Sequence, residues 1–357
     1  MHDTRHETLH SRLKTENSRQ FLMPAEWEPH KATWLSWPKD PETFPPGTVE
    51  QVEEIYIKMI EELRKGEIVK ILVNDSATEE KITSMLHDTK NVEFHKIKSV
   101  DVWMRDYGPI FVLNRKEKKI IATKWQFNAW GSKYSDLLPD NVAGMEAAKT
   151  TGCEIIETET ILEGGSIDNN GLGTCLTTEQ CLLNKNRNPK MTKEEIEQTL
   201  KQYLGFTNII WLGEGIEGDD TDGHVDDITR FVNKNTIVTM VEENTNDANH
   251  EPLAKNLELL KNAKDQDGKK FNVIPIQMPG RINDEDRRLP ASYANFYIGN
   301  ACVLVPIFND KEKDNKALSI LGKLFPDRKI VGIPCQALVY GYGGIHCVTQ
   351  QEGQINR

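Results

Sequence analysis

Residues 222–232 have the sequence DGHVDDITRFV, a glycine turn that carries several ionisable side chains and leads directly into an apolar strand. Four other segments share this plan of a Gly- or Asn-bearing turn followed by an apolar strand: WMRDYGPIFVL (103–113), ILEGGSI (161–167), ASYANFYIGNACVLVPIF (291–308) and GGIHCVTQQ (343–351). Their reactive side chains are Asp106, Glu163, His224, Asn295 and Cys347, separated by 57, 61, 71 and 52 residues. A period near sixty residues indicates a repeated supersecondary unit. Five such units around an axis would each present one turn to a common centre.

Helical patterns lie between these turns. The clearest is an apolar stripe at helical spacing from Val52 to Leu63. Capping boxes predict helix starts at Thr48, Ser76 and Thr192, and glycines predict helix ends at Gly66 and Gly205. Further helices are expected at 142–149, 251–262 and 311–324, and short apolar strands at 67–74, 92–97, 154–157, 207–212, 271–278 and 329–333. The sequence therefore predicts an α/β protein built from repeated helix–strand pairs.

Composition sets the broad class. The chain has 357 residues, 38% of them hydrophobic and 28% charged, so it can bury a large core. No domain boundary is evident, and we expect one domain over 1–357, with residues 1–22 as an N-terminal extension of low order. The net charge of -11 disfavours nucleic-acid binding and would attract a cationic ligand. The charged N-terminus and the lack of an 18-residue apolar run predict a cytoplasmic protein without a membrane partner, and a homo-oligomer is allowed.

Neither the cysteines nor the acidic run predicts a metal site. Six cysteines are dispersed without a CxxC pair, which argues against a disulfide framework and a zinc ribbon. The run EGDDTDGHVDD (217–227) has a rival interpretation as a hard-metal loop through Asp219, Asp220, Asp222 and Asp226, but its spacing does not fit a calcium loop. The glycine-rich GYGGIHC (341–347) lacks the lysine of a phosphate-binding loop.

The reactive side chains fit chemistry on a guanidinium group. A guanidinium is planar and offers five donors, so carboxylates such as Asp106, Glu163 and Asp226 are its natural partners. Its delocalised carbon calls for a soft nucleophile, and we predict the thiolate of Cys347, activated by a cationic substrate. His224 and Asp226 are two residues apart and would share one face of an extended segment, where His224 could move protons.

The histidine beside Cys347 is assigned a structural role. Adjacent residues in a strand point to opposite faces, so we expect the side chain of His346 to point away from the site.

Together, the segments WMRDYGP, LEGGS, NKNRNP, TDGHVDD, ASYANFYI and GIHCVTQQ resemble the agmatine deiminases, within the family that includes bacterial peptidyl-arginine deiminase-like proteins. The resemblance extends from about Met23 to Gln351. It implies a five-fold pseudosymmetric α/β propeller, the pentein fold, and conversion of agmatine to N-carbamoylputrescine and ammonia through a covalent amidino-cysteine, without metal or organic cofactor. The implied catalytic residues are the nucleophile Cys347, the acid/base His224 and the guanidinium-binding carboxylates Asp106, Glu163 and Asp226.

The resemblance also implies substrate contacts from aromatic residues, at Trp103 and at Trp37 in the LSWP segment. The chain departs from the common agmatine-deiminase pattern at Asp222 and Gly344, and we expect Asp222 to bind the distal ammonium of agmatine. These departures leave peptidyl-arginine and free arginine open as substrates of the same mechanism. A cysteine amidase acting on a neutral amide and a non-catalytic metal-binding module are more distant alternatives.

Overall fold

The computed structural model describes residues 20–44 and 47–355, and in this part of the chain the strands form five sheets and one hairpin. In every sheet one strand pairs antiparallel with a central strand, which pairs parallel with the next. The sequence prediction of a repeated α/β unit is thus matched by a recurring strand arrangement.

The strands are grouped by sheet as follows. The first sheet contains β1 (Phe21–Leu22), β5 (Ile110–Asn114), β6 (Lys119–Gln126) and β7 (Glu154–Ile161), and the second contains β8 (Asp168–Asn169), β9 (Thr174–Thr178) and β10 (Asn208–Leu212). The third contains β11 (Thr229–Asn233), β12 (Thr236–Val241) and β13 (Asn272–Gln277), and the fourth β16 (Tyr297–Ile298), β17 (Cys302–Ile307) and β18 (Lys329–Pro334). The fifth contains β19 (Gln350–Gly353), β2 (His30–Ser36), β3 (Ile68–Val73) and β4 (Val92–Lys96). The hairpin is β14 (Asn283–Asp284) with β15 (Arg287–Arg288).

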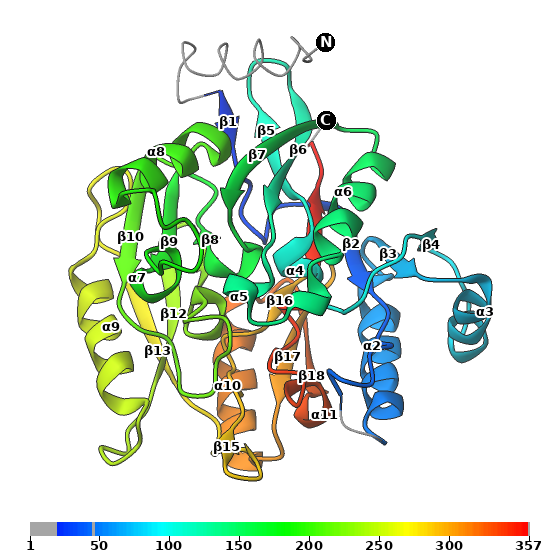
Figure 1. The fold of residues 1–357 in the computed structure, drawn as a ribbon. Coiled ribbons are helices and arrows are strands. Elements are labelled where there is room, and N and C mark those ends of the chain that lie inside the picture. Colours follow the sequence, from blue (N-terminus) through cyan, green and yellow to red (C-terminus); the bar gives the residue numbers. More distant parts are fainter. Residues whose placement is uncertain (1–19, 45–46, 356–357) are drawn as a thin grey trace.

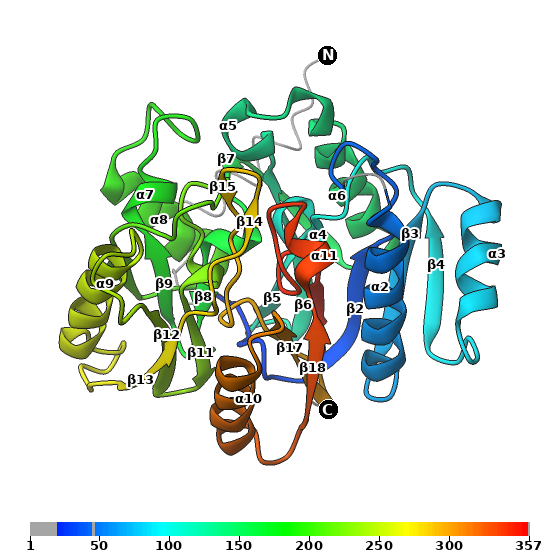
Figure 2. The same cartoon turned by 90° about the horizontal axis from the view of Figure 1, so that it is seen from below.

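A helix of ten or more residues precedes the last strand of each sheet: α3 (Ser76–Met85), α6 (Asp140–Thr150), α8 (Lys193–Leu204), α9 (His250–Asn262) and α10 (Lys311–Leu324). The fifth sheet has a second such helix, α2 (Val49–Leu63), before β3. Figures 1 and 2 show α2, α9 and α10 on the outer side of the sheets. The shorter helices are α4 (Met104–Tyr107), α5 (Ala129–Ser132), α7 (Glu179–Leu182), α11 (Gln336–Val339) and the 3-10 turns η1 (Ser135–Leu137), η2 (Gly164–Ser166) and η3 (Val225–Asp227).

Local sequence signals explain several helix ends. The capping box at Thr192 and Glu195 is present, and α8 ends at Gly205, whose φ of 76° is left-handed and favours glycine. The predicted cap at Ser76 is wrong, because the Asp75 side chain accepts the hydrogen bond from Thr78 N and the helix begins one residue earlier.

The N-terminal segment is more ordered at its end than expected. Residues 1–19 of the predicted extension lie outside the described residues, but β1 pairs antiparallel with β5 and Phe21 is buried. The extension therefore does not reach to residue 22.

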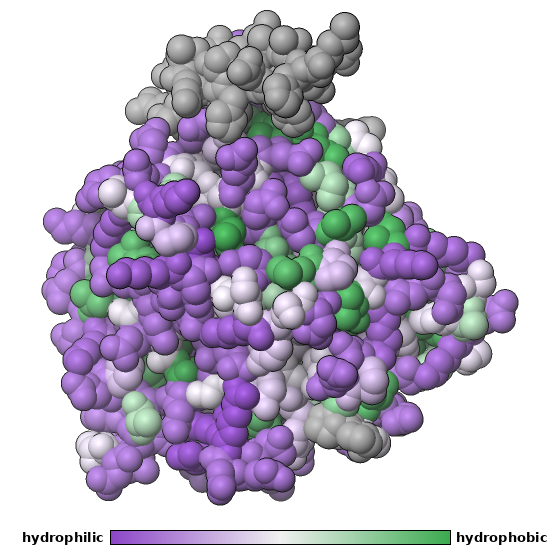
Figure 3. All heavy atoms as spheres, viewed as in Figure 1, coloured by the Kyte–Doolittle hydropathy of each residue, from purple (hydrophilic) through white to green (hydrophobic). Residues whose placement is uncertain are grey.

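The face of the molecule shown in Figure 3 is mainly hydrophilic. On the face shown in Figure 3, apolar residues lie in small separate groups among hydrophilic ones. Among the described residues, no helix combines the length and apolar character needed to cross a membrane.

Candidate active site

The five predicted turns occupy equivalent places in the five sheets. Asp106 lies in α4 before β5, Glu163 precedes η2 and β8, and His224 precedes η3 and β11. Asn295 comes two residues before β16, and Cys347 three residues before β19. Each reactive side chain thus precedes the strand that pairs antiparallel with the centre of its sheet, which is why side chains far apart in sequence can meet.

These turns converge on Gly165 in η2. A Cβ atom at Gly165 would lie 2.5 Å from His224 Nδ1, 2.9 Å from Asp106 Oδ1 and 3.0 Å from Asp226 Oδ2. His224 Nδ1 is itself 3.8 Å from Asp106 Oδ1 and 4.0 Å from Asp226 Oδ1. The histidine and two of the predicted carboxylates therefore surround one point, and only glycine leaves it open.

Cys347 joins this group through Asp226 and Asn295. Its Sγ is 3.8 Å from Asp226 Oδ2, and the Asn295 side-chain amide donates a hydrogen bond of 3.1 Å to the sulfur. Asn295 also donates to Asp227 at 2.9 Å, and its Oδ1 accepts from the backbone N–H of His346 at 2.8 Å. The amide is thereby fixed with a donor aimed at the thiol, a contact that stabilises a thiolate more than a thiol.

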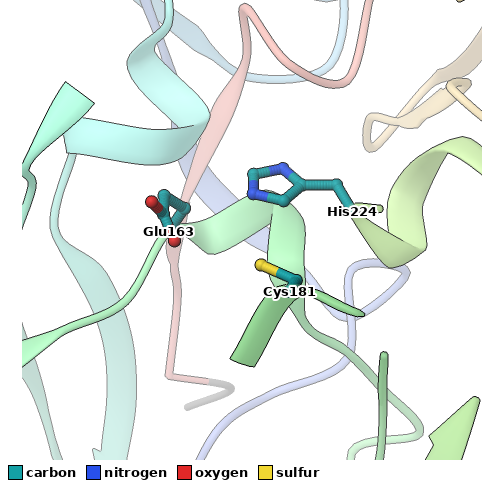
Figure 4. Close-up of side chains that lie close together, drawn as sticks. All are labelled: Glu163, Cys181 and His224. Atoms are coloured by element: carbon teal, nitrogen blue, oxygen red, sulfur yellow. The ribbon is translucent and has the colours of Figure 1, made fainter. Parts of the chain in front are cut away.

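Glu163, the last of the predicted catalytic residues, lies with a carboxylate oxygen within 4.8 Å of a ring nitrogen of His224. Figure 4 shows the side chains of Glu163, Cys181 and His224 turned toward one another. One Glu163 oxygen, Oε1, accepts a 2.7 Å hydrogen bond from Arg187 Nε, and both side chains are buried. Arg187 also donates to the Thr221 carbonyl and to Asp222, so the guanidinium is held rigidly behind Glu163.

Several buried polar atoms of the site are left without a hydrogen-bond partner among the described residues. They are Glu163 Oε2, both ring nitrogens of His224 and Asp226 Oδ1. Unsatisfied buried polar atoms are rare in native structures and costly, so their convergence indicates a polar ligand, with donors for the two carboxylate oxygens.

The electrostatics suit a protonated histidine and a neutral thiol before substrate binds. Burial raises the pKa of Asp106 to about 6, with His224 opposing the rise and the Asp226 carboxylate adding to it. Burial alone would lower the pKa of His224, but the Asp106 and Asp226 carboxylates raise it well above its ordinary value. Burial raises the pKa of the Cys347 thiol well above its usual range, and the nearby carboxylates add to that effect.

A cavity of about 190 Å³ gives access to the group. Asp106, Cys347 and Trp103 line it, and Trp103 is fixed by a 2.7 Å hydrogen bond from its indole N–H to Asp101. The other described lining residues are Asp40, Glu42, Thr43, Asp101, Trp130, Tyr134, Asp136, Leu137, Asp220, Thr221, Gly341, Tyr342 and Gly343. Six of the lining residues are acidic, and none of those described is Lys, Arg or His.

The structure corrects three sequence predictions. Trp37 does not line the cavity; it packs in the core against Tyr56, and its indole N–H donates to Glu53. Asp222 does not face the cavity either, because Lys133 and Arg187 occupy its two oxygens at 2.7 Å each.

The third correction concerns His346. The residues before β19 form a turn and not a strand, so side chains do not alternate there. Instead of pointing away, His346 contacts Asp226 Oδ2 through Nδ1 at 2.7 Å. The only sequence signal that placed His346 in the site was its position next to Cys347.

Two residues of the site were not predicted from the sequence at all. Glu26, in the loop between β1 and β2, contacts His346 Nε2 through Oε2 at 2.7 Å. Trp130 donates its indole N–H to Asp106 Oδ2 at 2.9 Å. Neither lies in one of the five repeated turns, and their partners are distant in sequence, so local pattern carried no signal for them.

Two groups of side chains have the donor atoms of a metal site. They are Glu163, Cys181 and His224, and Asp226, Asp227 and Cys347, with the donor atoms of each group within 4.8 Å of one another. Arg187 already neutralises Glu163, and burial raises the pKa of both thiols. A fixed cation and protons therefore compete with a metal ion at these atoms.

Acidic side chains of the run 217–227 are also paired with other groups of the protein. Asp219 accepts backbone hydrogen bonds from Thr221, Gly223 and His224, which shapes the turn that carries the histidine. Asp220 pairs with Arg287. These contacts leave the run as a structural turn and not a hard-metal loop.

Comparison with known proteins gives a consistent picture. Residues 22–352 match the family model described as Porphyromonas-type peptidyl-arginine deiminase. An agmatine deiminase from Medicago truncatula is 36% identical over an alignment of 366 positions, gaps included, which covers 94% of this chain and 97% of the relative.

Solved structures of similar proteins have the same fold. A C. jejuni agmatine deiminase with substrate bound is 34% identical and superposes with a TM-score of 0.85, covering 94% of this chain and 97% of the other. An Enterococcus faecalis agmatine deiminase is 31% identical with a TM-score of 0.87 and the same coverage.

Proposed function

The chain belongs to the Porphyromonas-type peptidyl-arginine deiminase family, and on that basis we propose that it is a guanidine iminohydrolase that converts agmatine and water to N-carbamoylputrescine and ammonia. The observation that carries the proposal is that the Cys347 thiol and the Asp106 carboxylate line one small cavity. A guanidinium bound to carboxylates there would present its carbon to the sulfur.

The lining favours agmatine over free arginine. Both carry a guanidinium, but agmatine ends in an ammonium, whereas arginine adds an α-carboxylate. Six acidic residues and no described basic residue line the cavity, so a carboxylate would meet like charges and find no cation to bind. An ammonium at the same place would be attracted.

Asp106, Asp226 and Glu163 bind the guanidinium in this proposal. The free oxygens Asp226 Oδ1 and Glu163 Oε2 need donors, and the guanidinium supplies five N–H groups in one plane. The positive charge of the substrate lowers the pKa of Cys347 as it binds and releases the thiol proton, because opposite charge favours the thiolate.

The chemistry then proceeds in two stages. The Cys347 thiolate attacks the guanidinium carbon and forms a C–S bond, and His224 donates its proton to one terminal nitrogen as that C–N bond breaks. Ammonia leaves, and an amidino group remains on the sulfur. Neutral His224 next takes a proton from water, and the hydroxide adds to the same carbon. The C–S bond then breaks to release the thiolate and the protonated ureido product, which loses its O–H proton to solvent.

We propose a five-bladed arrangement of the same sheets, the pentein fold, in one domain over residues 1–357. The shared strand order of the five sheets and the equivalent positions of their reactive turns support it. A core cluster that extends from Trp34 to Val348 supports a single domain. A cytoplasmic location, a homo-oligomeric state and the lack of nucleic-acid and membrane partners remain predictions from the sequence.

The test is release of ammonia and ureido product from agmatine, free arginine and a blocked arginyl peptide. Wild type should act on agmatine with the highest kcat/KM, and Cys347→Ala should abolish turnover. Cys153→Ala is the matched control, because Cys153 is half-buried and outside the cavity lining. Turnover by Cys347→Ala, or of none of the three compounds by wild type, would refute the proposal. Turnover of the peptide alone would retain the chemistry and change the substrate.

A further inference from the structure

His346 lies between two carboxylates at hydrogen-bond distance on both sides. Its Nδ1 is 2.7 Å from Asp226 Oδ2, and its Nε2 is 2.7 Å from Glu26 Oε2. All three side chains are buried. A neutral imidazole carries only one N–H, so one of its nitrogens would present a lone pair to a carboxylate in a region without water to intervene. Burial would raise the pKa values of Glu26 and Asp226, but the surrounding cations hold both below their ordinary values, so both carboxyls are ionised. The two contacts are then satisfied together only when both ring nitrogens carry hydrogen.

The surroundings supply the charge balance for this protonated state. Glu26 Oε1 accepts from Arg230 at 2.8 Å, and Arg105 lies 3.3 Å from Glu26 Oε2. Arg230 also pairs with Asp168 at 3.3 Å. With an imidazolium at His346, the buried network contains three anions (Glu26, Asp168 and Asp226) and three cations (Arg105, Arg230 and His346), and it is neutral.

The network has a direct effect on one substrate-binding group. Asp226 faces His346, His224 and Arg230 as cations, and Asp227, Asp106 and the Cys347 thiol on its other sides. His346 occupies Oδ2 of Asp226 and leaves Oδ1 without a partner, 4.0 Å from His224 Nδ1. The histidine thus determines both which oxygen is available and how the carboxylate is turned.

We propose that His346 is a positioning residue for the deiminase reaction: as an imidazolium fixed by Glu26, it keeps Asp226 ionised and directs the free oxygen of Asp226 to the guanidinium. This inference rests on the proposed function for its consequence in catalysis. Glu26, anchored by Arg105 and Arg230, is the second positioning residue. The sequence predicted one functional histidine in this site, His224. His346 is a second one, and it transfers no proton to the substrate.

The direction of the effect on the pH profile follows from the charges. Burial would raise the pKa of Asp226, and the hydrogen bond and charge of His346 hold it below its ordinary value. Loss of an adjacent opposite charge raises a carboxyl pKa by about 1–3 units, and uncompensated burial by up to about 3–5 units. His224 and Arg230 remain beside Asp226 when His346 is replaced, so burial stays partly compensated and the pKa of Asp226 should rise by about the amount expected for one lost charge.

The kinetic test compares His346→Gln with wild type over the pH range of activity on agmatine. Gln keeps one N–H donor but no charge. The acid limb of kcat/KM should move to higher pH, and KM should rise by about tenfold or more, the loss expected for one charge-assisted hydrogen bond. Glu26→Gln should move the limb in the same direction by less, because its amide oxygen can still accept from His346.

His30→Gln is the matched control. His30 is also buried, pairs with a carboxylate, Glu67, at 3.2 Å and contacts the Glu26 backbone carbonyl, but it does not contact Asp226. It should lose stability and keep the wild-type acid limb. An unchanged acid limb in folded His346→Gln, or an equal shift in His30→Gln, would overturn the proposal.

A second measurement does not depend on activity or on the folding of a variant. In full-length wild type with ¹⁵N-labelled histidine, both ring nitrogens of His346 should carry protons under the conditions of the kinetic assay. A neutral tautomer there would overturn the proposal even if agmatine is turned over. If agmatine is not turned over and His346 is doubly protonated, the proposed function fails and the buried imidazolium stands.

Discussion

Gly165→Ala should damage catalysis with little change to the backbone. Gly165 lies within the 3-10 turn η2, a conformation that alanine adopts without strain. The new methyl group would enter the space between His224, Asp106 and Asp226, whose side-chain atoms lie 2.5–3.0 Å from the position of its carbon. The expected effect is therefore local and steric.

Its magnitude can be worked from the distances. The added Cβ would lie 2.5 Å from His224 Nδ1, about 0.9 Å closer than ordinary van der Waals contact at 3.4 Å. His224 or η2 must move by a similar amount. A displacement of about 1 Å at catalytic groups costs on the order of 10²-fold in rate, or about 2.7 kcal/mol of transition-state stabilisation. Overpacking of this kind also costs about 1–3 kcal/mol of stability.

The assay is kcat/KM for agmatine together with urea unfolding, so that lost activity can be separated from lost folding. Gly322→Ala in α10 is the control, because its new Cβ would meet only Ile330, at an ordinary 3.7 Å. It should keep wild-type activity. If folded Gly165→Ala retained kcat/KM within about threefold of wild type, the packing of the site deduced here would be incorrect.

Three further outcomes test the charges of the protein. Arg187→Met should lower the free energy of unfolding by about 3–5 kcal/mol, because it leaves Glu163 buried without its cation; a loss near zero in urea titration at pH 7 would contradict this. Burial lowers the pKa of Lys124 to about 7, below that of the unfolded chain, so the folded state binds fewer protons between the two values and its stability rises with pH there. Lys124→Met should be more stable than wild type below about pH 7, and this gain should shrink as the pH rises toward about 10. A difference in stability that stays constant over this pH range would contradict the lowered pKa of Lys124. Alkylation of Cys347 by iodoacetamide should be slower than that of free cysteine at pH 8 and still rise above pH 9, whereas a plateau below pH 8 would mean a thiolate at rest.

Local patterns predicted the elements of the fold well where one physical signal dominates. The helix expected at 311–324 is α10 over the same residues, and the capping box at Thr192 is formed. The cap was predicted at Ser76, but the preceding residue Asp75 takes the position, because its carboxylate accepts from Thr78 N. Sequence alone does not rank such neighbours, since the choice depends on the direction from which the chain enters the helix.

The site was predictable as far as the repeat extended. Equivalent turns in five units were expected to meet, and Asp106, His224 and Asp226 do surround one point. Glu26 lies outside the repeat, and its contact with His346 spans 320 residues, so no local pattern reports it. His346 was misassigned because strand alternation was applied to a turn.

The basic side chains behind the site carboxylates share one physical task. The carboxylates that bind a cationic substrate repel one another when the substrate is absent. Cations on the side away from the substrate reduce this repulsion. Arg187 takes one oxygen of Glu163 and leaves the other free, and His346 does the same for Asp226. Asp106 receives only neutral donors, from Trp130 and the Gly165 backbone, and its pKa rises to about 6. Glu163 and Asp226 therefore each have a basic side chain at one oxygen, whereas the charge of Asp106 depends on protonated His224 and on the substrate itself.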